Sequence, residues 1–250
     1  MDHRFIARQM CHLTEKMLWE PRREWALKRN PKASLSTRVG PGLKTYHSHR
    51  SDMTTNADMT ITYGLKMVVS KSNPDQMCRW LSAKEIHKRG YFGSELNMLN
   101  LVAHTVVHEF GHLVQVLLDW RHSNSVHNDG FYRILDRIHS SGEADRVRNA
   151  LHQACREMSM DLSRVTPSEA ALARFLGVDT SGARLLTAAN FRVGQDVWLS
   201  GPDGERYNPL RVVKKARTRV YVESHNPAQA GIRLSVPARL LSKSPPERTF

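Results

Sequence analysis

The sequence has few cysteines and few aromatic residues, and it contains no long hydrophobic run. Among 250 residues there are only 3 cysteines, and aromatic residues make up 7%. Cys11, Cys78 and Cys155 are odd in number and far apart, which argues against a disulfide framework and against a cysteine zinc ribbon. No stretch of about 18 apolar residues occurs, and the start, MDHRFIARQM, lacks an apolar signal core. We therefore expect neither a membrane span nor export, which predicts a cytoplasmic protein.

The net charge of +13 is concentrated at the two ends of the chain. Residues 1–50 carry 11 Lys/Arg and 4 Asp/Glu, residues 51–188 carry 15 and 15, and residues 189–250 carry 11 and 5, so the excess is +7, 0 and +6. A neutral middle flanked by basic ends favours attachment to a polyanion. Nucleic acid fits better than a membrane, because no basic amphipathic helix with a large aromatic face is evident. A solvated basic surface is the alternative reading.

The most informative stretch is residues 108–112, which read His-Glu-Phe-Gly-His within a run of apolar residues. Residues four apart lie on one face of a helix, so His108 and His112 can present two imidazoles to one metal ion, with Glu109 beside them to act on a water molecule. This is the zincin motif. A glycine inside the helix costs about 1 kcal/mol relative to alanine. Gly111 therefore indicates that a substrate, a backbone segment or a packed side chain comes close there.

A long helix should carry this motif. Ser94 is a suitable N-cap, Glu95 places negative charge in the first turn, and the helix should end near Trp120. Apolar residues at steps of three and four predict its core-facing side: Leu96, Leu99, Val102, Val106, Phe110, Leu113 and Leu117.

Zinc needs a third protein ligand and keeps a fourth position open. The candidates are His104, His122, His127 and Glu143. Three ligands in a line along one helix surround a tetrahedral ion poorly, which assigns His104 to a supporting or core role, and His122 follows the helix end too closely. Glu143 would suit zincins whose third ligand lies on a later helix. His127 has room for the chain to turn and precedes a new apolar pattern, so it is the preferred ligand.

Together, residues 108–112 and the later segment His-Asn-Asp-Gly-Phe at 127–131 resemble the SprT-like (Spartan) metalloproteases, whose signature is HExxH followed by an HGxxF-type motif. The resemblance covers roughly residues 55–140. It implies zinc bound by His108, His112 and His127, Glu109 as general base, and activity against proteins attached to DNA. The chain differs from the family pattern in having Asn128 where the motif has glycine, and in lacking the zinc ribbon that many members carry.

Other elements can be predicted around this motif. Residues 3–29 read as a support helix interrupted at Pro21, and residues 59–69 alternate as a strand that covers the active helix or, as an edge strand, aligns an extended substrate. Residues 82–85, Ser-Ala-Lys-Glu, match a capping box for a short helix that Gly90 ends. Later helices are expected at 131–139, at 143–160 and from Thr166 to Gly177.

From Ala189 onward the pattern changes to short β-type runs at 193–199, 211–215, 218–223 and 232–236. They look like a small SH3-like barrel of the kind found in nucleic-acid-associated proteins. Four cations cluster around one predicted hairpin and suit phosphate contacts: Lys214, Lys215, Arg217 and Arg219. A barrel that docks another protein is the rival interpretation.

The sequence thus predicts an α+β fold with a zincin-like helical protease core, a small sheet and a C-terminal SH3-like β-barrel. The expected domains are residues 1–50 (basic helix and linker), 51–188 (protease), 189–243 (β module) and 244–250 (tail). The expected function is a Zn²⁺-dependent endopeptidase that associates with DNA and cleaves DNA-bound or crosslinked proteins. Tyr132, His122 and His104 are candidates to stabilise the oxyanion. The alternatives are a zinc-containing DNA-binding protein without proteolysis, and a zinc peptidase with an unrelated soluble substrate.

Overall fold

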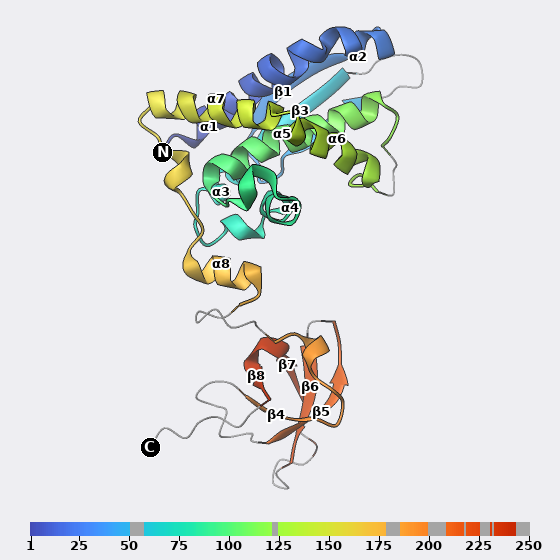
Figure 1. The fold of residues 1–250 in the computed structure, drawn as a ribbon, viewed down its shortest axis with the longest axis vertical. Coiled ribbons are helices and arrows are strands. Elements are labelled where there is room, and N and C mark those ends of the chain that lie inside the picture. Colours follow the sequence, from blue (N-terminus) through green and yellow to red (C-terminus); the bar gives the residue numbers. More distant parts are fainter. Residues whose placement is uncertain are drawn as a thin grey trace. The chain divides into compact units, whose positions relative to one another are not determined.

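A computed structural model describes residues 1–50, 58–121, 125–178, 186–199, 209–217, 219–225, 231 and 233–243. The chain forms two compact units, Met1–Phe175 and Leu176–Phe250 (Figure 1). Each unit has its own hydrophobic core. The first 50 residues contribute to the core of the N-terminal unit through Ile6, Met10 and Leu18, all fully buried.

The N-terminal helical segment changes its winding along its length. Helix α1 spans His3–Leu13 and continues as a π-helical stretch, Thr14–Trp19, then as a 3₁₀ turn, Glu20–Arg22, before α2 at Arg23–Arg29. The 3₁₀ turn contains Pro21, which has no N–H to donate to a preceding carbonyl. The predicted interruption at this proline is therefore confirmed.

The sheet of the N-terminal unit has three strands in the order β1-β3-β2: β1 Ser34–Gly40, β2 Tyr46–Arg50 and β3 Asp58–Gly64. Strand β3 lies in the centre, parallel to β1 and antiparallel to β2. Because β3 ends at Gly64, the prediction of one strand over residues 59–69 was wrong in length. At Gly64 the carbonyls of Gly42 and Lys44 come so close that a Cβ would lie 2.6 Å from each, and the chain turns there into α3, Leu65–Lys71.

Helix α4 spans Leu81–Arg89 and ends at Gly90, whose φ of 72° is left-handed, as the sequence predicted. The predicted capping box was wrong: the N-cap is Trp80, and the side chains of Ser82 and Glu85 bind residues of other helices. A 3₁₀ segment, Tyr91–Ser94, then precedes α5.

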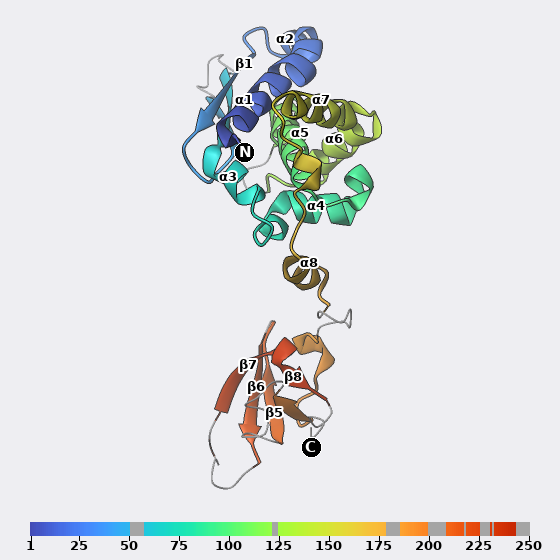
Figure 2. The ribbon, with the colours of Figure 1, turned by 90° about the vertical axis from the view of Figure 1, so that its left-hand side faces the viewer.

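Helix α5 spans Met98–Leu117 and lies in the middle of the unit, between the sheet and helices α6 and α7 (Figure 2). Its N-cap is Asn97 rather than Ser94, because the Asn97 side chain accepts a hydrogen bond from the Asn100 N–H at 2.8 Å, whereas Ser94 has a left-handed φ of 63°. Almost every residue of α5 is buried, so the motif lies on a rigid central helix.

Three further helices follow: α6 Asp129–Ser140, α7 Glu143–Glu157 and α8 Glu169–Leu176. All three were predicted within a few residues. Helices α6 and α7 pack on α5 and place Phe131, Leu135 and Val147 in the core. In the part of the chain that is described, no helix is long and apolar enough to cross a bilayer.

The described residues of the C-terminal unit form a five-stranded antiparallel sheet in the order β7-β6-β5-β4-β8. Its strands are β4 Asp196–Leu199, β5 Leu210–Lys215, β6 Arg219–Ser224, β7 Arg233–Pro237 and β8 Leu241–Ser242. Its core is formed by Phe191, Val197, Val212 and Val222, among others. Strands β7 and β8 are the outer strands, and no pairing between described residues closes the sheet into the expected barrel.

Candidate metal centre

Three histidine side chains meet at one point of the N-terminal unit. The Nε2 atom of His127 lies 3.2 Å from the Nε2 atoms of both His108 and His112. His108 and His112 face the same side of α5, and His127 comes from the turn before α6. In a tetrahedral zinc site with Zn–N distances of 2.0–2.1 Å, two nitrogen ligands lie about 3.3 Å apart. The three atoms therefore have the spacing of metal ligands.

The second nitrogen of each helical histidine is held by an acceptor. The Nδ1–H of His108 donates to the Glu85 carboxylate at 2.9 Å, and the Nδ1–H of His112 donates to the Gln115 side-chain oxygen at 3.3 Å. Donation from Nδ1 leaves an unprotonated lone pair on each Nε2. The single hydrogen that His127 Nε2 can carry serves at most one of these lone pairs, whereas a cation between the three rings can bind both.

The turn that carries His127 is fixed by Asn128. Its side-chain oxygen caps α6 by accepting from the Phe131 N–H at 3.0 Å and also accepts from Gln115 Nε2 at 3.1 Å, while its Nδ2 donates to the Trp120 carbonyl at 3.0 Å. Asn128 thus joins the end of α5 to the start of α6. A residue that departs from the SprT-like motif thereby orders the turn before α6 by side-chain hydrogen bonds.

The packing of Phe131 accounts for Gly111. The Phe131 ring stacks on the His112 imidazole with centroids 4.3 Å apart, and a Cβ on Gly111 would lie 3.2 Å from that ring. Of the explanations open from the sequence, close packing by a side chain is the one that the structure supports.

The other candidate ligands lie elsewhere or are engaged. His104 is fully buried, and both of its ring nitrogens are used: Nε2 bonds Glu85 at 2.9 Å and Nδ1 bonds His139 at 3.1 Å. Glu143 pairs with Arg22. His122 lies outside the described residues. Glu85, His104 and His108 also form a compact group, but it is held by direct hydrogen bonds between its members.

A cavity of about 290 Å³ opens beside the three imidazoles, and Glu109 lines it with them. Burial raises the pKa of the Glu109 carboxyl, and the backbone N–H of His47 on β2 partly opposes this rise. Burial also lowers the pKa of His112 and of His127, with the nearby His108 adding to the effect, which favours the neutral imidazoles that metals bind. The site therefore combines three neighbouring imidazoles with a buried carboxylate suited to accept a proton.

Sequence reasoning missed several residues at this site. Glu85 was read as a capping residue, and Gln115 was not singled out. Lys71 is buried at the cavity and donates to Ser82, Thr105 and the Leu101 carbonyl, and burial lowers its pKa to about 7. The contacts of Glu85 and Lys71 join elements distant in sequence, so no local pattern indicates them, whereas Gln115 lies three residues after His112 on the same helix and its role was open to a reading of helical spacing.

Of the proposed oxyanion donors, Tyr132 and His104 do not line the cavity, and His122 lies outside the described residues. The Tyr132 hydroxyl donates to Glu85 at 3.2 Å, and His104 is occupied as described. Arg121 and His47 line the cavity instead, with Arg121 Nη1 3.2 Å from His47 Nδ1. Among the described residues, these two side chains are better placed to approach a developing negative charge.

In the C-terminal unit, the β5–β6 hairpin brings the four predicted phosphate-binding cations together, all with exposed side chains: Lys214, Lys215, Arg217 and Arg219. Lys215 donates to the Phe191 carbonyl at 2.8 Å, and Arg219 donates to Ser235 at 2.9 and 2.8 Å. Lys214 lies 5.8 Å from the centroid of the Tyr221 ring. Lys215 and Arg219 therefore already make hydrogen bonds within this unit.

Comparisons with models of known protein families, with curated proteins and with solved structures found no match to this chain.

Proposed function

We propose that the protein is a zinc-dependent endopeptidase with His108, His112 and His127 as ligands. The observation that carries the proposal is the meeting of three imidazole Nε2 atoms at metal-ligand spacing beside the buried carboxylate of Glu109. Neutral imidazoles in a three-histidine set suit zinc, and a catalytic zinc site keeps a fourth position open. A purely structural site has no use for a carboxylate that faces this position.

Zinc, when bound, lowers the pKa of water and polarises the scissile carbonyl. Glu109 takes the proton from the attacking water and passes it to the leaving amine, and its raised pKa brings it closer to the pH at which such transfer is efficient. Arg121, at the rim of the same cavity, supplies positive charge near the carbonyl oxygen as it becomes negative.

Strand β2 offers a way to hold an extended substrate. Within the described part of the chain it pairs with β3 alone, and its residues Tyr46 and His47 line the cavity. A free strand edge can bind a peptide through main-chain hydrogen bonds. The edge role expected for residues 59–69 therefore passes to β2, because β3 is paired on both sides.

Association with DNA is the second part of the proposal. The net charge of +13, the basic ends and the exposed cations of the β5–β6 hairpin support it. The hairpin belongs to a small five-stranded sheet unit, which we take to be related to SH3-like modules. In this scheme the substrates are proteins bound or crosslinked to DNA, and the enzyme acts in the cytoplasm. A zinc-containing DNA-binding protein without proteolysis, or a peptidase for an unrelated soluble protein, are the competing functions.

The test compares the wild type with the Glu109→Gln and His127→Ala variants. Elemental analysis should find one zinc in the wild type and in Glu109→Gln, and much less in His127→Ala. Casein cleavage and self-cleavage, with and without single-stranded DNA, should occur in the wild type alone. Full zinc retention by His127→Ala would contradict the ligand set. Zinc binding without any cleavage by the wild type would favour the non-proteolytic alternative.

A further inference from the structure

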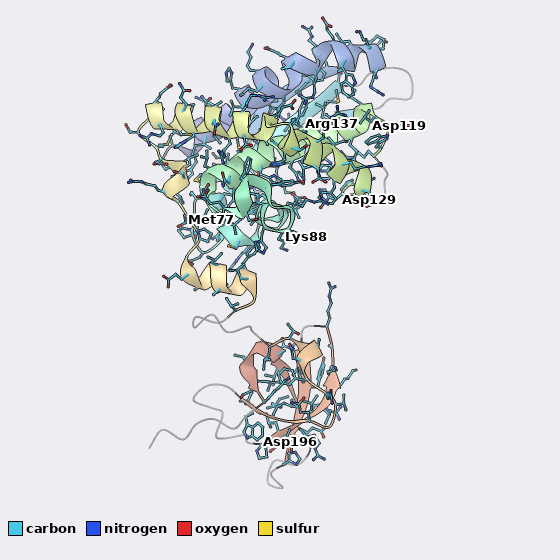
Figure 3. All side chains as sticks on the ribbon, in the orientation of Figure 1. Met77, Lys88, Asp119, Asp129, Arg137 and Asp196 are labelled. Atoms are coloured by element: carbon cyan, nitrogen blue, oxygen red, sulfur yellow. The ribbon has the colours of Figure 1, made fainter. Side chains whose placement is uncertain are left out.

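A second cavity of the N-terminal unit, of about 720 Å³, lies between α2, the end of α5 and α6. It shares no lining residue with the cavity of the metal centre. We call it the tryptophan groove, after the half-buried Trp25 and the exposed Trp120, which line it together with the exposed Arg29, Arg133 and Arg137. Arg137 is labelled on α6 in Figure 3.

The groove is strongly basic. Four arginines and one carboxylate line it, and the carboxylate, Glu143, is paired with Arg22. For Arg29, Arg133 and Arg137, no ion pair with a carboxylate is found in the described parts of the chain. The exposed Asp119 and Asp129, labelled in Figure 3, do not line the cavity. The excess positive charge calls for an anionic ligand.

The most exposed apolar side chain of the groove is aromatic. Its aliphatic floor is nearly closed, with Val114, Ile134 and Ile138 only 8%, 7% and 4% exposed, whereas Trp120 is 39% exposed. The Arg29 guanidinium lies 5.1 Å from the Trp25 ring centroid, and the Arg133 guanidinium lies 5.3 Å from that of Trp120. Each guanidinium lies over one face of its ring, so the remaining exposed ring surface can stack on a base next to a cation that has no carboxylate partner among the described residues.

The Trp120 backbone is held firmly. Its carbonyl accepts from Asn128 at 3.0 Å and from Gln115 at 3.4 Å, and its N–H donates to the Gln115 carbonyl at 2.9 Å. Because Gln115 also binds His112, a ligand stacked on Trp120 lies beside the residues that order the metal centre.

We propose that the tryptophan groove binds single-stranded nucleic acid, with bases stacked on Trp25 and Trp120 and phosphates at Arg29, Arg133 and Arg137. Bases in a duplex are already stacked on one another, so the rings favour a single strand. An acidic peptide would match the charge but would leave the rings without a stacking partner. This inference rests on the nucleic-acid association in the proposed function. It does not depend on peptidase activity.

The experiment measures the binding of full-length protein to a labelled oligothymidylate of about 12 nucleotides, a length within the range of single-strand sites. Trp120→Ala should weaken binding about 5- to 150-fold, the range expected for losing one stacked base, and should leave binding to a duplex of equal length unchanged. Arg133→Gln/Arg137→Gln should flatten the slope of log affinity against log salt by about 1.4, or 0.7 per phosphate contact. Arg156→Gln/Arg164→Gln removes the same charge from exposed arginines outside the groove and should leave the slope unchanged.

Unchanged single-strand affinity and salt slope in both groove variants would overturn the proposal. A second result would also overturn it: the arginine variant loses binding to a polyglutamate peptide but keeps its binding to the oligonucleotide. The groove would then be a binding site for acidic proteins. The arginine variant keeps the test valid if Trp120→Ala fails to fold. Zinc content and casein cleavage are measured separately. If the groove does not bind nucleic acid, the peptidase proposal is unaffected, and if the protein is not a peptidase, the groove proposal is unaffected.

Discussion

Glu85 should control the affinity of the metal centre without touching the metal. Its carboxylate is 4% exposed along its side chain and accepts from His108 Nδ1 and His104 Nε2, both at 2.9 Å. Burial opposes its ionisation, yet these two hydrogen bonds hold the pKa of the carboxyl well below its ordinary value. Glu85 is therefore an anion that fixes the ring orientation and the tautomer of His108.

Glu85→Gln keeps the size of the side chain and removes its charge. If the amide oxygen takes the place of the shared carboxylate oxygen, both histidines keep an acceptor, but His108 loses the electrostatic support for its basicity. If the amide is reversed, its NH₂ faces His108 and favours the tautomer with hydrogen on Nε2, which cannot bind metal. Removing such a supporting group typically lowers metal affinity 10- to 100-fold, or about 1.4 to 2.7 kcal/mol.

The assay is competition for zinc between the protein and a chelating indicator at pH 7. Glu95→Gln is the matched control, because Glu95 is exposed and the same charge is lost. Thermal unfolding of both metal-free variants shows whether the change has damaged the fold. A zinc affinity for Glu85→Gln within twofold of the control would refute the reasoning, since the hydrogen bond to His108 would then have no bearing on the metal.

Four further predictions concern packing, charge, metal and DNA. Gly111→Ala gains about 1 kcal/mol of helix propensity but crowds Phe131 at 3.2 Å, so unfolding in urea should show a net loss of about 1 kcal/mol. Because burial lowers the pKa of Lys71 to about 7, folding releases its proton between pH 7 and 10.5. Wild-type stability should therefore rise with pH across that window, by up to roughly 5 kcal/mol in total, and this rise should be absent in Lys71→Met. Chelation of zinc should lower the melting temperature and leave far-UV circular dichroism unchanged, because the core of the N-terminal unit consists of apolar side chains that are not among the proposed ligands. Lys214→Gln/Arg217→Gln should reduce the salt slope of single-stranded DNA binding by about 1.4.

The parts of the site that could be predicted are those that depend on the spacing of residues within one segment of the sequence. His108 and His112 lie four residues apart on a helix whose apolar pattern is plain, and His127 precedes the apolar pattern of α6. Glu85 could not be predicted as a partner of His108, because the contact joins α4 to α5 and the sequence around Glu85 matches a capping box equally well. When a carboxylate comes to lie beside a histidine only through folding, neither of the two sequence segments contains a pattern that indicates the contact.

The sheet shows the same limit. Residues 59–69 alternate throughout, yet the strand ends at Gly64, where the backbone of residues 42–44 comes too close for any side chain. The parallel pairing of β1 with β3 and the edge position of β2 are set by connections across the whole unit. Periodicity predicts that a strand exists, while the strand's neighbours decide its end and its place in the sheet.

The proposed metal centre is ordered by contacts between protein groups. Two of its histidines stand on a buried central helix, and the turn of the third is tied to that helix by Asn128, whose side chain also caps α6. Glu85 and Gln115 already fix the tautomers and ring orientations of His108 and His112. Metal binding therefore costs little further conformational entropy. This arrangement differs from that of small domains whose folding free energy comes from zinc itself. It suits a catalytic ion, because the protein can leave the fourth position open for substrate without losing its fold.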